Sequence, residues 1–173
     1  MQKIIVTGGL GFIGSNLIKI LLQKKYKVIN IDKISYASNF YNVKNFKKNK
    51  NYSFIKCDIN NKKKILNILK KNKPVGIFNI AAETHVDRSI DSPNNFIHSN
   101  ILGVYNLLES ILIYMKKSKK KIKLVHVSTD EVYGDVIKMR TNEKFAYNPS
   151  SPYSATKASA DHLIKAYVRT YKL

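Results

Sequence analysis

Tyr153 and Lys157 are the residues whose types and spacing most directly suggest chemistry. They stand one helical turn apart in the segment Tyr-Ser-Ala-Thr-Lys, so a helix would place the phenol and the ammonium on one face. A free phenol has a pKa near ~10, and a close ammonium lowers that pKa because it favours the phenolate. The pair therefore indicates a base that works at neutral pH. A chance surface pair is the alternative, since the chain has 11 tyrosines and is rich in lysine.

A glycine-rich loop near the start suggests a ligand for such a base. Four of the seven glycines fall between Gly8 and Gly14, in the order Gly8-x-x-Gly11-x-x-Gly14, after an apolar strand and before a helical segment. Glycine allows a tight turn and close backbone approach, and N–H groups at a helix start bind a pyrophosphate. This context predicts a dinucleotide site, with Gly8, Gly11 and Gly14 at the phosphates. An ordinary tight turn is the alternative.

Asp32, at the end of the second predicted strand, refines this interpretation. In dinucleotide-binding folds an acidic residue at that place accepts hydrogen bonds from the adenosine ribose and repels a 2′-phosphate. Asp32 therefore favours NAD over NADP as the cofactor. A simple surface aspartate is the alternative.

The end of the fifth predicted strand carries the triplet Thr129-Asp130-Glu131. Reaction sites of parallel sheets lie at the carboxyl ends of the strands, where Thr129 could offer a hydroxyl to the oxygen that Tyr153 deprotonates. Asp130 and Glu131 add two carboxyl groups, which alcohol oxidation alone does not need. Eliminating water does need an acid and a base. A capping or turn role for the two carboxylates is the alternative.

Alternating strands and helices are expected to hold these residues in place. Short apolar runs predict five strands, at Lys3–Thr7, Lys27–Ile31, Tyr52–Cys57, Gly76–Ala82 and Leu124–Ser128. Helical patterns lie at Phe12–Leu22, Lys62–Lys71, from Pro93 into the lysine run 116–123, and at Tyr153–Tyr171. In the first helix we expect Ile13, Leu17, Ile20 and Leu21 to form the apolar stripe. The segments Ser35–Asn51 and Gly134–Ser151 read as loops, the first with a short helix. The pattern predicts an α/β protein, a Rossmann-like, doubly wound parallel sheet of about five strands in the order 3-2-1-4-5.

Composition argues for a folded protein with few unusual partners. Residues 1–173 are 44% apolar, without the run of about 18 apolar residues that would indicate a membrane span. Residues 1–7 resemble a buried strand, and we expect no signal-peptide core before them. The single cysteine, Cys57, fits a reducing cytoplasm. The net charge of +20 invites nucleic-acid binding, but only three of 31 basic residues are arginines. We therefore expect no nucleic-acid partner, no membrane partner and no metal site.

Taken together, these motifs resemble the extended short-chain dehydrogenase/reductases, and within them the nucleotide-sugar 4,6-dehydratases. The resemblance rests on the glycine loop and the Tyr-Lys pair, and on the segments 32–37 (Asp-Lys-Ile-Ser-Tyr-Ala), 58–59, 81–89 (Ala-Ala-Glu-Thr-His-Val-Asp-Arg-Ser) and 128–134. It implies that NAD is the cofactor, with dTDP-glucose as the substrate. The residues that it implies for NAD, beyond the glycines and Asp32, are Phe12, Ile13, Lys33, Ser35, Asp58, Ile59, Ala81, Ala82, Thr84, Ser99, Tyr153 and Lys157.

The resemblance also implies a reaction in three stages. Tyr153 takes the proton of the sugar 4-hydroxyl while a hydride leaves C4, with Lys157 and Thr129 assisting. Glu131 then removes the acidified C5 proton as Asp130 protonates the departing 6-hydroxyl. The hydride finally returns to C6. Substrate contacts are implied for Thr84, His85 and Thr129.

Several alternatives remain open within this resemblance. A UDP-glucose 4,6-dehydratase would use the same groups, whereas an epimerase would not need Asp130 and Glu131. An inactive dinucleotide-binding fragment is the alternative from another class, because the family's carboxyl-terminal substrate domain has no counterpart in residues 1–173. The chain therefore reads as one incomplete NAD-binding domain that binds NAD but turns over little alone. The family implies a homodimer, and Ser38 departs from it by replacing a usual glycine.

Overall fold

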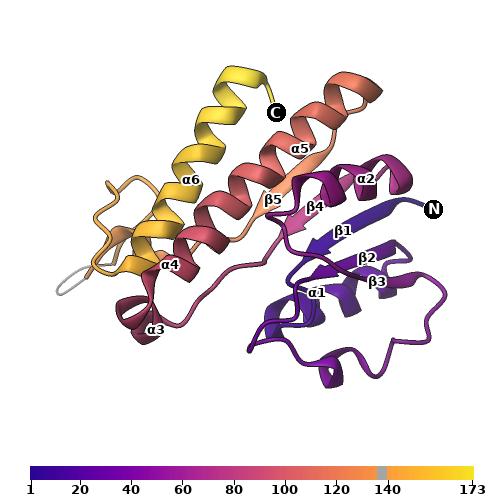
Figure 1. The fold of residues 1–173 in the computed structure, drawn as a ribbon, viewed down its shortest axis with the longest axis horizontal. Coiled ribbons are helices and arrows are strands. Elements are labelled where there is room, and N and C mark those ends of the chain that lie inside the picture. The colour runs from indigo at the N-terminus through magenta and orange to yellow at the C-terminus, as the bar shows by residue number, and fades with distance from the viewer. Residues whose placement is uncertain (136–139) are drawn as a thin grey trace. The chain divides into compact units, whose positions relative to one another are not determined.

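The computed structural model describes residues 1–135 and 140–173 (Figure 1). The chain forms two compact units. Unit 1 comprises Met1–Ala81 and Asn106–Val127, and unit 2 comprises Ala82–Tyr105 and Ser128–Leu173. Part of the loop expected at 134–151, residues 136–139, lies outside the described residues.

Unit 1 contains a parallel five-stranded sheet in the order β3-β2-β1-β4-β5, which confirms the expected topology. Its strands are β1 (Lys3–Thr7), β2 (Lys27–Asp32), β3 (Tyr52–Lys56), β4 (Gly76–Asn79) and β5 (Lys123–His126). The register pairs Ile5 with Ile29 on one side and with Ile77 on the other. β-Branched residues fill these central positions because both faces of a parallel sheet are covered.

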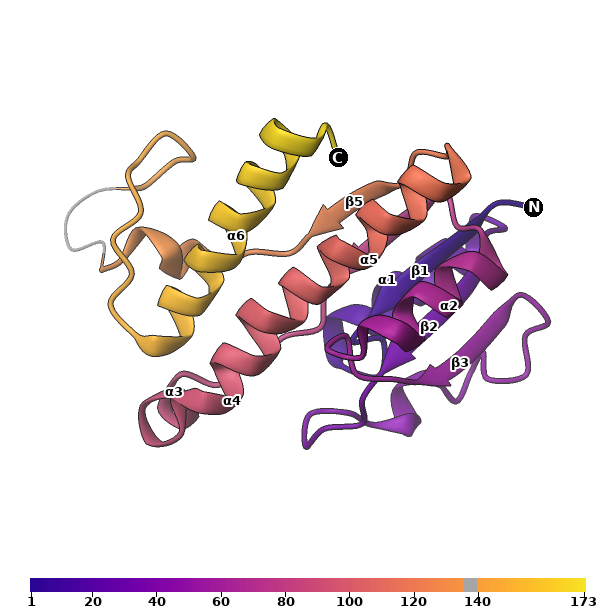
Figure 2. The same cartoon turned by 45° about the horizontal axis from the view of Figure 1, so that its top comes forward.

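Three helices lie beside this sheet: α1 (Phe12–Gln23), α2 (Lys62–Asn72) and the part of α5 (Gly103–Ser118) from Asn106 onward (Figure 2). The strand order reverses direction after β3, so right-handed crossovers place α1 on one face and α2 and α5 on the other. Hydrogen bonds join α2 to α5, where Ser110 Oγ donates to the Lys62 carbonyl at 3.3 Å.

The buried stripe of α1 differs from the expected one. Ile18 and Leu21 pack with Ile4, Val6 and Val28 in the core of unit 1, whereas Ile13 and Ile20 are about half exposed. The stripe is rotated because Gly14 faces the glycine loop at close range, which fixes which side of the helix meets β1 and β2. Leu17 is partly buried against the same core.

Unit 2 is helical and is built around α6 (Pro152–Tyr171). Packed against α6 are α3 (Val86–Asp91), α4 (Pro93–Phe96), the π-helical stretch η2 (Ile97–Leu102) and the 3₁₀ turn η3 (Asp130–Tyr133). The sequence predicted neither α3 nor η3, and it did not distinguish the π-helical stretch within the long helix that begins at Pro93. A second 3₁₀ turn, η1 (Phe40–Val43), supplies the short helix expected between β2 and β3.

The helical run Pro93–Ser118 is long enough to cross a membrane, with a mean hydropathy of 1.3 over its most apolar window. Of that window, 56% is buried inside the structure. Core helices of globular proteins have the same length and composition, so this run reads as part of the protein interior.

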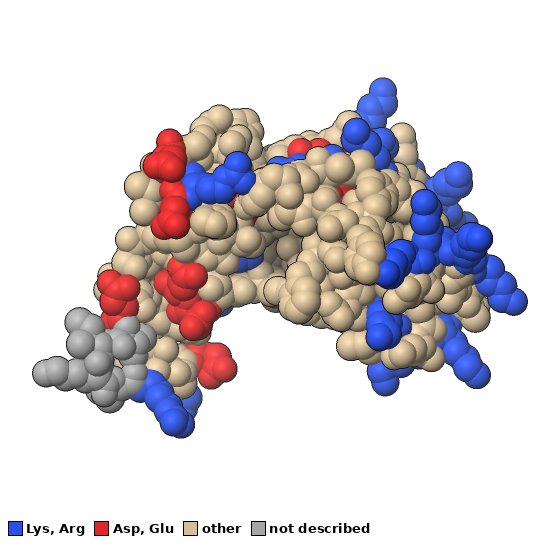
Figure 3. Space-filling model, turned by 90° about the horizontal axis from the view of Figure 1, so that it is seen from below, with Lys and Arg blue, Asp and Glu red and all other residues tan. Residues whose placement is uncertain are grey.

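The net positive charge lies in unit 1, because basic and acidic residues balance in unit 2. Of the 11 acidic residues only Asp32, Asp58 and Glu109 belong to unit 1, whereas it holds most of the lysines. On the face shown in Figure 3 many basic side chains project into solvent, several of them next to one another.

Candidate active site

The glycine loop of unit 1 is shaped by contacts that leave no room for side chains. Gly8 has a φ of +68°, and a Cβ there would lie 2.8 Å from the backbone of Ala81. A Cβ on Gly14 would lie 2.3 Å from the carbonyl oxygen of Gly8. Gly11 is the N-cap of α1 and offers no side chain to cap the helix. The loop therefore presents bare backbone at a helix N-terminus, a cradle that fits a pyrophosphate.

Thr7 joins the carboxyl ends of β1 and β4 beside this loop. Its Oγ1 donates to Asn79 Oδ1 at 2.6 Å and accepts from the backbone N–H groups of Ile80 and Ala81, each at 3.1 Å. These bonds turn the chain out of the sheet, which is why β4 ends at Asn79 and not at the expected Ala82. The two strands flank the point where the strand order reverses, the usual ligand crevice of such sheets.

Asp32 organises the same loop from the end of β2. Its Oδ2 accepts from the Leu10 N–H at 3.0 Å, and its Oδ1 accepts from the Ile34 N–H at 2.8 Å and from Ser38 Oγ at 2.7 Å. The carboxylate is 6% exposed. Asp32 thus holds the glycine loop and the segment after β2 together, a structural task beyond the ribose contact that the sequence predicts. Ser38, the departure from the family pattern, supplies one of the three donors.

The remaining residues predicted to bind the cofactor from unit 1 lie at carboxyl ends of strands or at the start of α1. Phe12 and Ile13 are 80% and 58% exposed, so core packing does not account for these two apolar side chains. Asp58 accepts from the Asn60 N–H at 2.8 Å in the turn before α2, and Ile59 beside it is buried. Lys33, Ser35 and Ala81 are partly buried.

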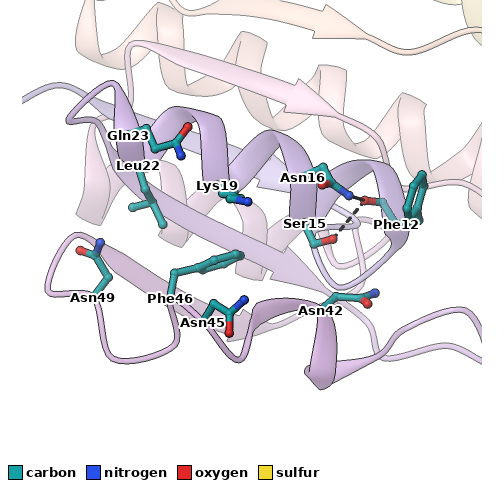
Figure 4. Close-up of a pocket in the computed structure, with 10 residues that line it drawn as sticks. All are labelled: Phe12, Ser15, Asn16, Lys19, Leu22, Gln23, Asn42, Asn45, Phe46 and Asn49. Atoms are coloured by element: carbon teal, nitrogen blue, oxygen red, sulfur yellow. Dashed lines mark hydrogen bonds between the residues drawn. The ribbon is translucent and has the colours of Figure 1, made fainter.

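A pocket of about 420 Å³ lies between α1 and the segment 42–49 (Figure 4). Amide side chains and Lys19 line much of it. Ser15 Oγ and Asn16 Nδ2 donate to the Phe12 carbonyl at 3.0 and 2.9 Å at one end. Of the residues that line this pocket, only Phe12 is a predicted site residue. The pocket is therefore distinct from the predicted cofactor site.

The carboxylates that follow β5 lie in unit 2. Thr129 is the N-cap of η3, and its Oγ1 accepts from the Glu131 N–H at 3.3 Å. The capping role is therefore filled by Thr129, whereas Asp130 and Glu131 occupy the first turn with exposed side chains. Their exposure leaves both carboxyl groups available to a ligand.

Helix α6 begins in a way that fixes Tyr153 firmly. Ser151 and Ser154 form a reciprocal capping box, and Pro152 occupies the first turn. The Tyr153 N–H donates to Ser89 Oγ of α3 at 3.1 Å, and its ring meets Phe96 edge to face with centroids 6.3 Å apart. Tyr153 is 7% exposed and Lys157 is 4% exposed.

The charge states of this pair differ from the simple expectation. Burial raises the pKa of Tyr153, a hydrogen bond with Thr129 lowers it, and the charges of Glu131 and Asp130 raise it again. Burial lowers the pKa of Lys157 to about 8, while Asp161 acts to raise it. The net shift of the Tyr153 pKa is upward, not downward as the Tyr-Lys spacing predicted, because burial outweighs the stabilisation of the phenolate.

Thr129, Asp130, Glu131, Tyr153 and Lys157 thus all belong to unit 2, and Thr129, Asp130 and Glu131 act electrostatically on the Tyr153 phenol. The structure brings together a base candidate, a hydroxyl and two carboxyl groups from segments that are distant in sequence. The other residues predicted in unit 2 differ in burial: Thr84 and His85 are exposed, Ala82 is intermediate and Ser99 is buried in η2.

Sequence reasoning missed Asn100, which anchors the segment after β4. Asn100 Oδ1 accepts from the Glu83 N–H at 2.8 Å, while its Nδ2 donates to the Glu83 carbonyl at 2.9 Å and to Thr156 Oγ1 at 3.0 Å. A buried amide with three such bonds specifies one arrangement of η2 against α6. The sequence offers one weak signal, an asparagine inside an otherwise apolar helix.

Comparison with known proteins places these features in context. The profile of the family described as GDP-mannose 4,6 dehydratase matches residues 5–173. The dTDP-glucose 4,6-dehydratase of Neisseria meningitidis serogroup B is 42% identical over 182 residues, covering 100% of this chain and 51% of that protein. The enzyme of the same name from Escherichia coli is 44% identical, covering 99% and 52%. The chain therefore spans about half the length of the curated relatives it matches.

Solved structures show the same fold. The dTDP-glucose 4,6-dehydratase DesIV from Streptomyces venezuelae, solved with NAD, has a TM-score of 0.92 at 35% identity, over 99% of this chain and 53% of that one. The Bacillus anthracis dTDP-glucose 4,6-dehydratase in complex with NAD has a TM-score of 0.86 at 43% identity, over 100% and 52%. A UDP-glucose 4-epimerase from Brucella ovis, also with NAD, has a TM-score of 0.88 at 26% identity, over 100% and 50%.

Proposed function

Because the chain belongs to the GDP-mannose 4,6-dehydratase family of extended short-chain dehydrogenase/reductases, we propose that it carries the NAD-binding and catalytic half of a dTDP-glucose 4,6-dehydratase. The observation that carries this proposal is the grouping in unit 2 of a buried tyrosine with a threonine and two carboxylates that act on its pKa. An epimerase needs the tyrosine but has no use for the acid–base pair.

Two features of the chain support NAD binding at the positions that the motifs predict. The cradle formed by Gly8 and Gly14 admits no side chain, and Asp32 stands at the end of β2, where a ribose is bound in such folds. Bound NAD would accept a hydride from C4 of the sugar and return it to C6. Within the cradle, the N-terminal N–H groups of α1 would hold the pyrophosphate, and the exposed Phe12 and Ile13 would be covered by the cofactor.

Each of the five candidate catalytic residues in unit 2 has a defined task in the proposed reaction. Tyr153 accepts the proton of the 4-hydroxyl in its phenolate form, which the hydrogen bond with Thr129 favours against the burial that raises the pKa of the phenol. Lys157 keeps a positive charge near the phenol. Glu131 removes the C5 proton, which the new 4-keto group acidifies, and Asp130 protonates the departing 6-hydroxyl. Oxidation must therefore precede elimination, and a final reduction at C6 restores the cofactor.

Calorimetric titration of the 173-residue chain tests the cofactor half of the proposal. We expect NAD to bind more tightly than NADP. Asp32→Asn should remove most of that preference, because it takes away the charge that repels a 2′-phosphate. Asp135→Asn, a change at an exposed carboxylate, serves as the matched control and should leave both affinities unchanged. A folded chain that shows no affinity for NAD would refute the proposal.

The substrate is tested with a longer form of the protein that includes the other half of the relatives' length. We expect such a form to convert dTDP-glucose to the 4-keto-6-deoxy sugar. UDP-glucose is the second candidate, since epimerases of that sugar share the fold. Preferential dehydration of UDP-glucose, or epimerisation without loss of water, would reassign the substrate or the reaction.

We also propose that the protein works as a homodimer in the cytoplasm. The resemblance to the family supports the dimer, built through the long helical run from Pro93 to Tyr114 and through α6. A lone cysteine without a disulfide, Cys57, is consistent with a reducing compartment. Light scattering of the protein as it elutes from a size-exclusion column measures the oligomeric state. Fractionation of cells measures the cytoplasmic location.

A further inference from the structure

A buried carboxylate in α6 has no task in the reaction described above. Asp161 is 9% exposed, and its Oδ2 accepts hydrogen bonds from two side chains that lie outside α6. The donors are Ser128 Oγ, at the residue that directly precedes the Thr129–Glu131 triplet, and Tyr147 Oη, at 3.1 Å. Burying a carboxylate costs free energy unless the carboxylate is paired and hydrogen-bonded. The two hydrogen bonds to Asp161 offset that cost.

Asp161 also continues the helix face that holds the Tyr-Lys pair. Tyr153, Lys157 and Asp161 follow at successive turns of α6, and residues four apart on a helix are neighbours. Asp161 is the residue whose charge acts to raise the pKa of Lys157 against the effect of burial. The same carboxylate thus lies one helical turn from the lysine and also bonds Ser128, just before η3.

The groups around Asp161 are themselves tied together. Tyr147, from the loop before α6, packs its ring against Tyr133 and His162, with centroids 5.3 and 5.1 Å apart. Lys165 Nζ lies 3.3 Å from the Tyr147 hydroxyl and 4.5 Å from its ring centroid. Burial, the charge of Asp161 and the hydrogen bond with Asp161 raise the pKa of Tyr147 to about 12, so this phenol stays a donor.

We propose that Asp161 is a positioning residue: it fixes Ser128, and with it the Thr129–Glu131 triplet, against the helix of Tyr153, and it supplies the counter-charge to the buried Lys157 one helical turn away. This inference rests on the proposed function for the meaning of those residues. Its physical content is independent of that function, because it concerns the charge of Lys157 and the attachment of Ser128 within one unit.

Other charged groups near Lys157 are accounted for. The elements packed against α6 are α3, α4, η2 and η3, and their ionisable residues are Asp87, Arg88, Asp91, His98, Asp130, Glu131 and Tyr133. Among the described residues, Asp161 is the one whose charge shifts the pKa of Lys157. Neutralising Asp161 should therefore lower the pKa of Lys157 further, because the charge of Asp161 no longer opposes the effect of burial.

The direct test measures the pKa of Lys157 by NMR of the 173-residue chain with carbon-13-labelled lysine. The Lys157 signal is assigned by its loss in Lys157→Arg. We expect Asp161→Asn to lower the Lys157 pKa by about one unit or more, and Asp161→Glu to keep it close to the wild-type value. Glu143→Gln, at an exposed carboxylate of the same unit, is the matched control. An unchanged Lys157 pKa in Asp161→Asn would overturn the inference.

A double-mutant cycle keeps the charge partnership testable if Asp161→Asn folds poorly. Removing the carboxylate takes its charge away from the buried ammonium, so adding Lys157→Met should restore much of the lost stability in urea unfolding. Additive effects of the two substitutions would contradict the proposed pairing of charges.

The attachment of Ser128 is tested by Ser128→Ala, which should speed hydrogen exchange of the Glu131 N–H about tenfold or more. Exchange that stays at the wild-type rate would refute that part.

These measurements separate the inference from the proposed function. If the chain fails to bind NAD while the Lys157 pKa falls in Asp161→Asn, the proposed function is wrong and the positioning role stands. If NAD binds and the pKa does not move, the function stands and the positioning role is wrong. Both readouts use the same folded sample.

Discussion

The backbone N–H of Tyr153 donates a 3.1 Å hydrogen bond to the hydroxyl of Ser89, 64 residues earlier in the sequence. The same hydroxyl donates to the Val86 carbonyl at 2.6 Å, and Ser89 is completely buried. One serine therefore attaches the first turn of α6 to α3 and satisfies an N–H that the start of a helix leaves without an intrahelical partner.

Ser89→Ala should destabilise the protein by about 1–3 kcal/mol, because it leaves the buried Tyr153 N–H without its acceptor. Chemical denaturation measures the free energy of unfolding. Ser159→Ala is the matched control, since Ser159 lies on the same helix and its hydroxyl donates to the Ala155 carbonyl within α6. Equal stability of the two variants would show that the contact with Ser89 contributes nothing.

Asn100→Ala should cost about 2–4 kcal/mol of unfolding free energy, because three buried hydrogen bonds to Glu83 and Thr156 disappear together. Thermal or urea unfolding provides the measurement. The exposed Asn94, in α4, offers a control substitution to alanine that should change stability by less than about 0.5 kcal/mol. A loss for Asn100→Ala no larger than that of the control would contradict the anchoring role.

Gly14→Ala should weaken NAD binding by about tenfold or more, since its Cβ would lie 2.3 Å from the Gly8 carbonyl oxygen and must displace the loop. Calorimetric titration with NAD reports the change. Gly76→Ala is the comparison, because a Cβ there meets only an ordinary contact at 3.5 Å. Unaltered affinity in a folded Gly14→Ala chain would exclude the loop as the pyrophosphate cradle.

The buried Lys157 should make stability depend on pH in a defined direction. Its pKa is lowered from 10.5 to about 8 in the folded chain, so between these values the unfolded chain binds more protons and stability rises with pH. Between about pH 8 and about pH 9.5, the free energy of unfolding of the wild type should rise by about 2 kcal/mol relative to that of Lys157→Met. The raised pKa of Tyr153 acts oppositely only above about pH 10. Parallel stability curves for the two proteins would contradict the shift.

Glu131→Gln should arrest the proposed reaction after the first hydride transfer, because the amide cannot take the C5 proton. In a longer form of the protein that turns over dTDP-glucose, reduced cofactor should accumulate and be visible by near-ultraviolet absorbance. Glu143→Gln controls for loss of an exposed carboxylate in the same unit. Normal turnover by Glu131→Gln would remove this residue from the role of base.

The strands and the glycine loop could be predicted from sequence because their signals are local. β-Branched runs place β1 at the expected residues, and glycines can be recognised wherever the backbone must approach itself. The strand order followed from the alternation of strands and helices with right-handed crossovers. The Tyr153–Lys157 pair likewise follows from spacing along one helix.

The surroundings of these residues were decided by the tertiary structure. The orientation of α1 depends on which side meets β1 and β2, so Ile13 and Ile20 face outward despite their place in a helical pattern. The hydrogen bond between Ser89 and Tyr153 joins residues 64 apart in sequence, and that between Ser128 and Asp161 joins residues 33 apart. Both bonds form only when other segments pack against α6. The pKa values of Tyr153 and Lys157 follow burial in that packed unit, a quantity that residue spacing does not contain.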